Sequence, residues 1–249
     1  MSGPKPLSGD AARPKKHRRT GSCGENFQLE KGNGWTYGRG AAACVNLPLV
    51  AVTNPSPHSE FATVVSGVPR SGTSLMMQML AAGGIELLTD SERAPDAGNP
   101  RGYFEFAPVK RLRNEARWFP EALGYAVKVV YALLKSLPDD VAARVVFMQR
   151  DLAEVVASQR AMLSRSGNPT DVLPPERMIE IFRAQVDETL EWVSQQPRLQ
   201  LLEVAHAEAI REPASVACAV NAFLGGGLDV SAMAAVPDPA LYHQRTARR

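Results

Sequence analysis

One short segment combines glycines, hydroxyl side chains and an arginine in an order that suits the binding of a phosphate group. It reads Gly67-Val68-Pro69-Arg70-Ser71-Gly72-Thr73-Ser74. Glycines let a turn bend tightly around an anion, so that backbone N–H groups point at it, and a following helix N-terminus adds partial positive charge. That helix dipole contributes only about 0.3–1 kcal/mol at an exposed site, so a charged side chain is also needed. Arg70 supplies it, and the segment predicts an anion-binding loop; in the alternative, Pro69 and the glycines serve only the geometry of an ordinary turn.

The segment differs from the most familiar phosphate-binding motif at one informative position. In G-x-x-x-x-G-K-[ST] the lysine reaches the terminal phosphates of a nucleoside triphosphate. Here Gly67 and Gly72 keep the glycine spacing, but Thr73 stands at the lysine position. The cation has moved inside the loop to Arg70, which favours a ligand other than a nucleoside triphosphate.

A second arginine stands where another expected strand meets a helix. Arg150 follows the apolar run 144–149, and Ser158 lies seven residues after Asp151, two helical turns along the same face. A phosphate beside Arg150 would therefore meet both groups, although a salt bridge from Arg150 to Asp151 or to a neighbouring helix is the alternative. A triphosphatase would need a magnesium-binding carboxylate directly after the strand. Gln149 and Arg150 stand there instead, and a guanidinium repels a divalent cation while binding phosphate well.

Both segments resemble the sulfotransferase family, particularly its tyrosylprotein-type and bacterial members, which read Pro-Arg-Ser-Gly-Thr at the loop. The first resemblance covers residues 65–76, the second is the arginine with a serine eight residues later, and weaker similarity extends over about 61–225. The resemblance implies 3'-phosphoadenosine 5'-phosphosulfate as the sulfuryl donor, with no metal. It also implies that Arg70 contacts the bridging oxygen and that Arg150 and Ser158 hold the 3'-phosphate. The rest of the donor loop is expected to be Pro69, Ser71, Gly72, Thr73 and Ser74.

An acceptor hydroxyl also needs a group that takes its proton. None of the four histidines lies between the loop and Val204, where the cytosolic members of the family keep their catalytic histidine, so a carboxylate is expected. Glu105 is the first candidate, because Phe104 and Phe106 would desolvate it and raise its pKa. A purely structural ion pair is the equal alternative for Glu105. The ion-pair partners considered are Arg101, Lys110 and Arg111, and the alternative bases are Asp90 and Glu92.

Two further polar residues have a structural interpretation that we favour over a functional one. Lys128 lies in an expected strand at 125–130 and would be a possible anion contact, but a solvated lysine at a sheet edge is the simpler interpretation. His206 follows an expected strand rather than lying at a cation-lined cleft, so we interpret it as structural.

The scaffold that must position these residues is predicted from hydrophobic periodicity. Strands are expected at 62–66, 125–130, 144–149 and 199–204, and helices at 71–82, 152–164, 175–195 and 213–224. This alternation implies a parallel sheet covered on both faces, and with the loop it predicts a three-layer α/β fold like that of the P-loop NTPases. We expect one domain over 59–249. Residues 1–58, rich in Gly, Pro, Ser, Lys and Arg without periodicity, are expected to be a mostly disordered extension.

Composition narrows the possible partners and the compartment. The 249 residues are 45% hydrophobic, and 28 Lys and Arg against 26 Asp and Glu give a net charge of +2. Such a balance gives no reason to expect nucleic acid or a membrane surface as partner. The apolar stretch 41–52 is shorter than the ~20 residues of a membrane span. Three widely spaced cysteines without a C-x-x-C pair are interpreted as free thiols, and a reducing cytoplasm is the simplest compartment.

The function expected from the sequence is sulfuryl transfer from this donor to a hydroxyl or amine acceptor. The acceptor class, whether small molecule, glycan or peptide, is left open. Two alternatives remain at this stage. One is a small-molecule kinase of the same fold, which would need magnesium and an acidic ligand for it. The other is a non-catalytic nucleotide-binding module that keeps both anion sites without a base.

Overall fold

A central sheet of five parallel strands organises the chain in the computed structural model. The structure describes residues 58–90, 96, 99, 101–165, 173–238 and 240, together with the backbone of two short strands at 28–29 and 34–36. The five strands are β3 (Ala62–Gly67), β4 (Leu87–Leu88), β5 (Ala126–Lys128), β6 (Ala143–Gln149) and β7 (Leu199–Ala205). They lie in the order β4-β5-β3-β6-β7. Beyond β7 the sheet continues with β2 (Gly34–Thr36), which is parallel to β7, and β1 (Gln28–Leu29), which is antiparallel to β2.

The central position of β3 follows from its sequence. All six of its residues are buried, and Thr63, Val64 and Val65 are β-branched. Val64 pairs with Val127 of β5 on one side and with Val145 of β6 on the other. A strand that is apolar on both faces is stable only where helices cover the sheet from both sides, so the sequence of β3 requires a three-layer arrangement.

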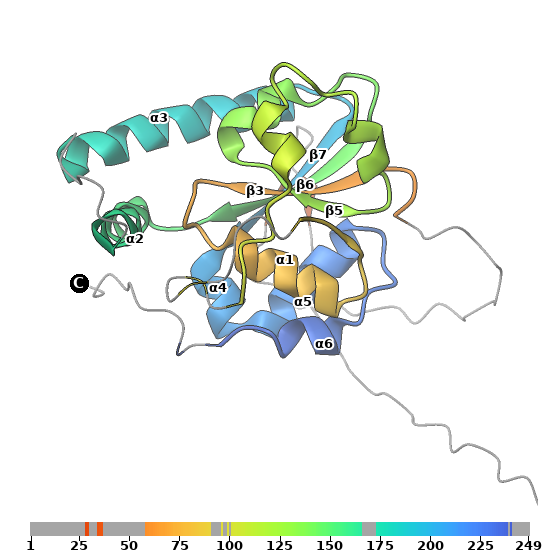
Figure 1. The fold of residues 1–249 in the computed structure, drawn as a ribbon. Helices are drawn as coiled ribbons and strands as arrows, with labels where there is room; N and C mark the ends of the chain where they lie inside the picture. Colours follow the sequence, from red (N-terminus) through yellow and green to blue (C-terminus); the bar gives the residue numbers. More distant parts are fainter. Residues whose placement is uncertain are drawn as a thin grey trace, which may run out of the picture.

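Helices cover both faces of this sheet. Figure 1 shows α1, α4, α5 and α6 below it, and α3 with the short 3-10 helices above it. The α-helices are α1 (Thr73–Ala82), α2 (Leu152–Arg165), α3 (Pro175–Ser194), α4 (His206–Arg211), α5 (Pro213–Phe223) and α6 (Val230–Ala234). The 3-10 helices are η1 (Ala107–Arg111), η2 (Phe119–Ala122) and η3 (Tyr131–Ser136). The predicted three-layer α/β fold with a central parallel sheet is confirmed.

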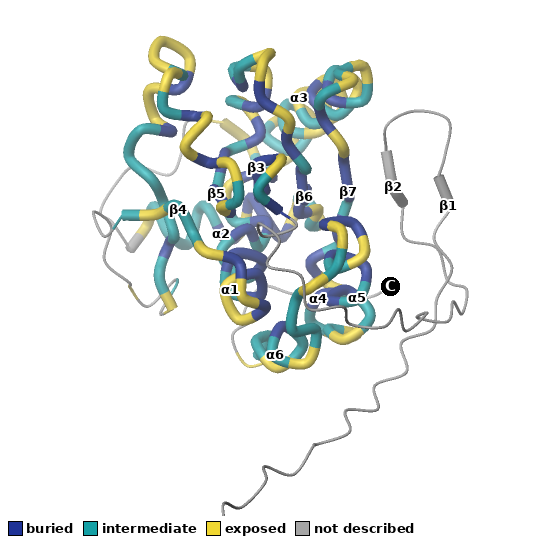
Figure 2. The backbone as a smooth tube through the Cα atoms, turned by 90° about the vertical axis from the view of Figure 1, so that its right-hand side faces the viewer, coloured by how far each residue is buried: buried dark blue, intermediate teal, exposed yellow. Residues whose placement is uncertain are grey.

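Each face of the sheet packs against its own hydrophobic core. On the α1 side, Met76, Met79 and Leu80 are fully buried. On the opposite side, Phe119 and Phe147 are buried against the sheet among the residues of the 3-10 helices and α3. Figure 2 shows the buried backbone running through the middle strands and the inner side of α1. The two cores fix the sheet, and with it the ends of the strands.

The strand order creates a crevice at the carboxyl ends of β3 and β6. The chain leaves β3 through α1 and builds β4 and β5 on one side, and it then returns to build β6 on the other side. In open parallel sheets this reversal leaves room for a ligand outside the strand ends. The loop after β3 and the residue after β6, Arg150, both lie at this point.

Three details differ from the sequence expectation. The first helix begins at Thr73 rather than at 71, because Gly72 adopts a left-handed backbone at its N-cap. The helix α4 and the two-residue strand β4 carry too few residues for a periodic signal and were not expected. Cys218 on α5 is disulfide-bonded, so the prediction of free thiols is wrong at this residue. Its partner cysteine and most of residues 1–58 lie outside the described residues.

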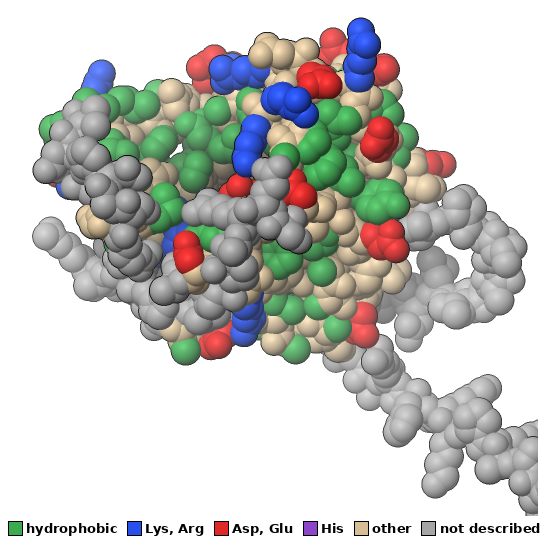
Figure 3. All heavy atoms as spheres, viewed as in Figure 1, with side chains coloured by type: hydrophobic (Ala, Val, Ile, Leu, Met, Phe, Trp, Pro, Cys, Tyr) green, Lys and Arg blue, Asp and Glu red, His purple; other side chains and the backbone are tan. Residues whose placement is uncertain are grey.

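No helix among the described residues is both long enough and apolar enough to cross a membrane. On the face drawn in Figure 3, Lys and Arg side chains are interspersed with Asp and Glu side chains.

Candidate functional site

The loop between β3 and α1 has a backbone that few sequences can adopt. Arg70 has φ 79° and Gly72 has φ 103°, both in the left-handed region. At Gly67, whose φ is 147°, an added Cβ would lie 2.7 Å from the carbonyl oxygen of Met148. Left-handed residues in such a turn point backbone N–H groups into a common concavity that suits an anion. A left-handed arginine costs energy, and such strain is concentrated at binding sites.

A cavity of about 460 Å³ opens over this loop. Seven of the nine residues predicted for the site line it: Pro69, Arg70, Gly72, Thr73, Ser74, Glu105 and Arg150. The two others, Ser71 and Ser158, do not line it. Lys128 and His206, which were expected to be structural, do line it.

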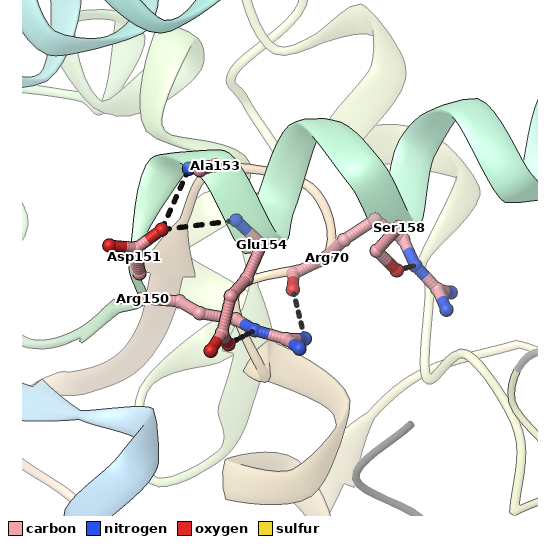
Figure 4. A network of polar contacts seen from close by, with 6 residues as sticks. All are labelled: Arg70, Arg150, Asp151, Ala153, Glu154 and Ser158. Atoms are coloured by element: carbon pink, nitrogen blue, oxygen red, sulfur yellow. Dashed lines mark hydrogen bonds and ion pairs between the residues drawn. The ribbon is translucent and has the colours of Figure 1, made fainter. Parts of the chain in front are cut away.

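The two arginines predicted to hold separate phosphates are neighbours. Arg150 donates from Nη1 to the backbone carbonyl of Arg70 at 3.1 Å, and Arg70 donates from Nε to the hydroxyl of Ser158 at 3.0 Å (Figure 4). Ser158 is buried on α2, so its contact with the cavity runs through the Arg70 side chain. The loop after β3, the end of β6 and helix α2 are thereby joined into one cationic corner.

Arg150 has an ion-pair partner that the sequence did not single out. Its Nε donates to Glu154 at 2.9 Å, and the two side chains are only 10% and 8% exposed. The expected partner Asp151 instead accepts from the backbone N–H groups of Ala153 and Glu154 and caps the start of α2 (Figure 4). In the sequence, only the four-residue spacing from Arg150 to Glu154 indicated that the two side chains could form an ion pair. This buried pair holds the guanidinium in one orientation beside the loop.

Lys128 lies inside the site, so its interpretation as a solvated edge lysine is wrong. Its Nζ donates to the hydroxyl of Ser74 at 3.1 Å and to the carbonyl of Tyr103 at 2.5 Å. The same Ser74 hydroxyl also accepts from the side-chain amide of Asn99 at 3.0 Å. The error came from β4, which is too short to recognise in the sequence and which makes β5 an interior strand. A third cation therefore reaches the start of α1.

His206 also lies at the cation-lined cavity, against our expectation. It is the first residue of α4, is 7% exposed, and packs so closely on the loop that a Cβ added at Gly72 would be 2.4 Å from its Cδ2. Burial, which is the largest cause, and the positive charge of Arg150 together lower the pKa of His206 to about 4, although Glu154 partly opposes them. The imidazole is therefore neutral near pH 7.

Glu105, the predicted base, is half-buried and lines the same cavity. Its backbone carbonyl accepts from the N–H of Asp90 and from the hydroxyl of Thr89, both at 2.9 Å, which fixes the segment that carries it. Two of the ion-pair partners considered for it bind elsewhere. Arg101 lies 3.7 Å from Asp238, and Arg111 lies 3.6 Å from Glu115.

Of the alternative bases, Asp90 is less well placed than Glu105. Asp90 does not line the cavity, and its Oδ2 accepts from the backbone N–H of Ala107, so it organises the loop rather than facing a ligand. Glu92 lies outside the described residues. Of the two candidates that the structure describes, Glu105 lines the cavity and Asp90 does not.

Ser71 turns away from the cavity that the rest of the loop lines. It is 1% exposed and faces a second cavity of about 260 Å³ behind the loop, bounded by the end of β6, α2 and α3. Its hydroxyl has no hydrogen-bond partner within the described part of the chain. Any contribution of Ser71 to an anion in the larger cavity would therefore come from its backbone.

No protein-family model matches the sequence, and no curated protein is similar enough in sequence to count as a relative. Among solved structures, the chain is similar to a sulfotransferase domain from the curacin biosynthetic pathway, with 16% identity, 75% of this chain and 78% of that chain covered, and a TM-score of 0.39. A sulfotransferase from Alicyclobacillus acidocaldarius shares 14% identity over 73% and 87% of the two chains, with a TM-score of 0.42.

A third similar structure is retinol dehydratase in complex with androsterone and the inactive cofactor PAP. It shares 13% identity over 70% of this chain and 62% of that chain, with a TM-score of 0.41.

Within the residues that the structure describes, no group of three or more His, Cys, Asp or Glu side chains is arranged to hold a metal ion.

Proposed function

We propose that this chain is a sulfotransferase that moves a sulfuryl group from 3'-phosphoadenosine 5'-phosphosulfate to a hydroxyl-bearing acceptor. The observation that supports the proposal most is that Arg70 and Arg150 line one cavity and adjoin there, with Arg150 Nη1 3.1 Å from the backbone carbonyl oxygen of Arg70. A donor with a phosphate at each end of one adenosine requires two cationic positions that adjoin, and this pair meets that requirement.

In this proposal the loop after β3 binds the 5' end of the donor, and Arg150 at the end of β6 binds its 3'-phosphate. Arg70 and the backbone N–H groups that precede α1 hold the phosphosulfate, Arg150 holds the 3'-phosphate, and Ser158 accepts a hydrogen bond from Arg70 and so positions that side chain. The residues fit such a ligand because each is a hydrogen-bond donor beside the concave turn, and arginine binds phosphate in a forked geometry. His206 packs closely on Gly72 of the loop and keeps its backbone in place.

The reaction that we propose is a single in-line displacement at sulfur. The acceptor oxygen forms a bond to sulfur while the bond from sulfur to the bridging oxygen breaks, and adenosine 3',5'-bisphosphate leaves. Charge develops on the bridging oxygen in such a loose transition state, and Arg70 and Lys128 are the cations at hand to stabilise it. Glu105 receives the proton of the acceptor hydroxyl, as a positioned carboxylate can.

Transfer of labelled sulfate tests the proposal directly. The protein is incubated with the labelled donor and a mixed panel of hydroxyl and amine acceptors in the presence of EDTA, and labelled products are separated. We expect transfer that survives the chelator and that falls by at least 100-fold in Arg70→Ala. Transfer of phosphate from ATP that requires magnesium would support the kinase alternative. Tight binding of adenosine 3',5'-bisphosphate without transfer to any acceptor would support the non-catalytic module.

A further inference from the structure

The backbone on both sides of the Arg70 Cα is held by side-chain donors. Gln159 on α2 donates from Nε2 to the carbonyl oxygen of Pro69 at 3.0 Å. Arg150 donates from Nη1 to the carbonyl oxygen of Arg70 at 3.1 Å (Figure 4). The first carbonyl belongs to the peptide unit before the Arg70 Cα, and the second belongs to the peptide unit after it. Together the two donors fix the orientation of both peptide planes that meet at Arg70.

This double hold matters because Arg70 has a conformation that arginine rarely adopts. Its φ of 79° lies in the left-handed region, which is unfavourable for a residue other than glycine. The angles φ and ψ relate the two planar peptide units of a residue, so fixing both planes fixes both angles. The peptide unit after Arg70 is also held at its other end, because the N–H of Ser71 donates to the carbonyl of Val68 at 3.0 Å. The peptide unit before Arg70 is held by Gln159.

Gln159 makes this contact from outside the cavity over the loop, which it does not line. It directly follows Ser158, which accepts from Nε of Arg70 at 3.0 Å. Neighbouring residues of α2 therefore hold the side chain of Arg70 and the peptide unit before it. A carbonyl oxygen can only accept a hydrogen bond, so the donor at Gln159 must be its side-chain amide. The contact joins a helix to the loop and does not require a bound ligand.

We infer that Gln159 is a positioning residue for sulfuryl transfer. By holding the carbonyl of Pro69, it keeps Arg70 in its left-handed conformation and so keeps the guanidinium where charge develops on the leaving group. This inference rests on the proposed function, because it connects the conformation of Arg70 to the chemical step. An interaction that acts through the leaving-group cation should change kcat more than donor affinity. Because the hydrogen bond is exposed to solvent, its loss should have a much smaller effect than the loss of Arg70 itself.

Three substitutions separate the donor group of Gln159 from the size of its side chain. Gln159→Met keeps the length and removes the amide, Gln159→Glu places an ionised carboxylate against the Pro69 carbonyl, and Gln159→Lys restores a donor. We expect kcat to fall about 5-fold in Gln159→Met, to fall further in Gln159→Glu, and to return to within about 2-fold of the parent in Gln159→Lys. The affinity of Gln159→Met for adenosine 3',5'-bisphosphate should stay within about 2-fold of the parent value.

Gln195→Met is the matched control for these variants. It makes the same change at an exposed glutamine that directly follows α3, and it should change neither kcat nor nucleotide affinity. Steady-state kinetics and calorimetry on the full chain measure the two quantities. Equal kcat in Gln159→Met and the parent, or equal kcat in Gln159→Glu and Gln159→Lys, would overturn the inference.

A double-mutant cycle asks whether Gln159 acts through Arg70. Single-turnover rates are measured for Gln159→Met, for Arg70→Ala and for the variant that carries both changes. Once the guanidinium is absent, its position no longer affects the rate. We therefore expect Gln159→Met to lower the rate about 5-fold in the parent and by less than about 2-fold in the Arg70→Ala background. A loss of equal size in both backgrounds would mean that Gln159 acts independently of Arg70, which contradicts a positioning role.

Hydrogen exchange distinguishes failure of this inference from failure of the proposed function. The exchange rate of the Ser71 amide is measured by NMR in the ligand-free parent, in Gln159→Met and in Gln195→Met. The Ser71 N–H bonds within the turn that Gln159 holds, so we expect exchange at least about 3-fold faster in Gln159→Met and at the parent rate in Gln195→Met. Unchanged exchange in Gln159→Met would contradict the role of Gln159. Faster exchange in Gln159→Met, with no sulfuryl transfer by the parent, would contradict the proposed function and leave the contact with the loop in place.

Discussion

At the scale of single residues, Arg70 and Arg150 have different surroundings, so replacing each of them should affect a different quantity, kcat or donor affinity. Arg70 stands on the strained loop and reaches Ser158, whereas Arg150 is fixed in a buried pair with Glu154. We expect Arg70→Ala to lower kcat far more than donor affinity, because its charge acts on the leaving group. Arg150→Ala should chiefly weaken donor binding. Steady-state kinetics together with calorimetry separate the two effects, and equal losses in both quantities would contradict the roles.

Arg150→Ala needs a control, because it removes the ion-pair partner of the buried Glu154 carboxylate. Removing one member of a buried ion pair typically costs about 3–5 kcal/mol, while replacing both members costs less. We therefore expect urea denaturation to show Arg150→Gln with Glu154→Gln to be more stable than Arg150→Ala. If the double variant also loses donor affinity, the loss belongs to the guanidinium and not to a loosened fold.

Glu105 and Asp90 offer a matched test of the proton acceptor. Glu105→Gln keeps the shape of the side chain and removes its ability to take a proton, so we expect kcat to fall by about 10²- to 10⁴-fold. Asp90→Asn keeps an oxygen for the Ala107 N–H and should leave kcat within a few-fold of the parent. Single-turnover rates measure both. A similar kcat in Glu105→Gln and the parent would remove Glu105 from the mechanism.

Because the pKa of His206 is lowered in the folded chain, we expect the free energy of unfolding to fall as the solution becomes more acidic. Its pKa is about 4 in the folded chain and about 6.5 in the unfolded chain, so between these values the unfolded state binds more protons. Stability that is present above pH 6.5 is lost as the pH falls toward 4, by an amount on the order of 3 kcal/mol. Burial also lowers the pKa of His58, which acts in the same direction.

The comparison with His206→Asn isolates this histidine, because His58 titrates in both proteins. Urea denaturation at steps from pH 7.5 to pH 4.5 should show a shallower decline in the variant. Parallel curves for the two proteins would mean that His206 is protonated as easily in the folded chain as in the unfolded one.

At the scale of elements, the contact between Gly72 of the loop and His206 of α4 should give energetic coupling between changes at the two residues. Gly72→Ala would place a methyl group 2.4 Å from the His206 ring and would hold an alanine at φ 103°. The left-handed backbone costs about 1–2 kcal/mol and the overlap about 1–3 kcal/mol. Gly72→Ala with His206→Ala removes the overlap only, so it should cost less than the sum of the single changes. Denaturation of the four proteins gives this coupling, and strict additivity would contradict a tight contact.

Much of the element pattern could be predicted from sequence because burial and periodicity agree there. The β-branched run that becomes β3, the apolar run of β6 and the long helix α3 lie within a residue or two of their expected positions. The loop and the arginine after β6 could be predicted as anion sites because their chemistry is local: a glycine turn, a helix start and a cation.

The remaining parts of the site depend on contacts that sequence spacing does not show. Lys128 was assigned to an edge because the two residues of β4 give no periodic signal. His206 was placed away from the site because nothing in its neighbourhood reveals that α4 starts against Gly72. Ser71 was assigned to the anion because of its position in the motif, yet its side chain lies on the other side of the loop. In each case a tertiary contact decides which way the side chain points.

At the scale of the whole molecule, the fold brings the ends of two strands together at one cavity. The order β5-β3-β6 sets the loop and Arg150 next to each other. The net charge is only +2, so the affinity for an anionic nucleotide must come from this corner and not from a general positive field.

Calorimetric titration of the chain with adenosine 3',5'-bisphosphate, in EDTA, tests this central claim most directly. We predict saturable binding without metal, and affinity at least 100-fold tighter than for adenosine 5'-monophosphate, because only the former engages both Arg70 and Arg150. At a ligand concentration one hundred times its dissociation constant, the same nucleotide should stabilise the fold by about 2.7 kcal/mol. Equal affinity for the two nucleotides, or binding only of ATP with magnesium, would contradict the account.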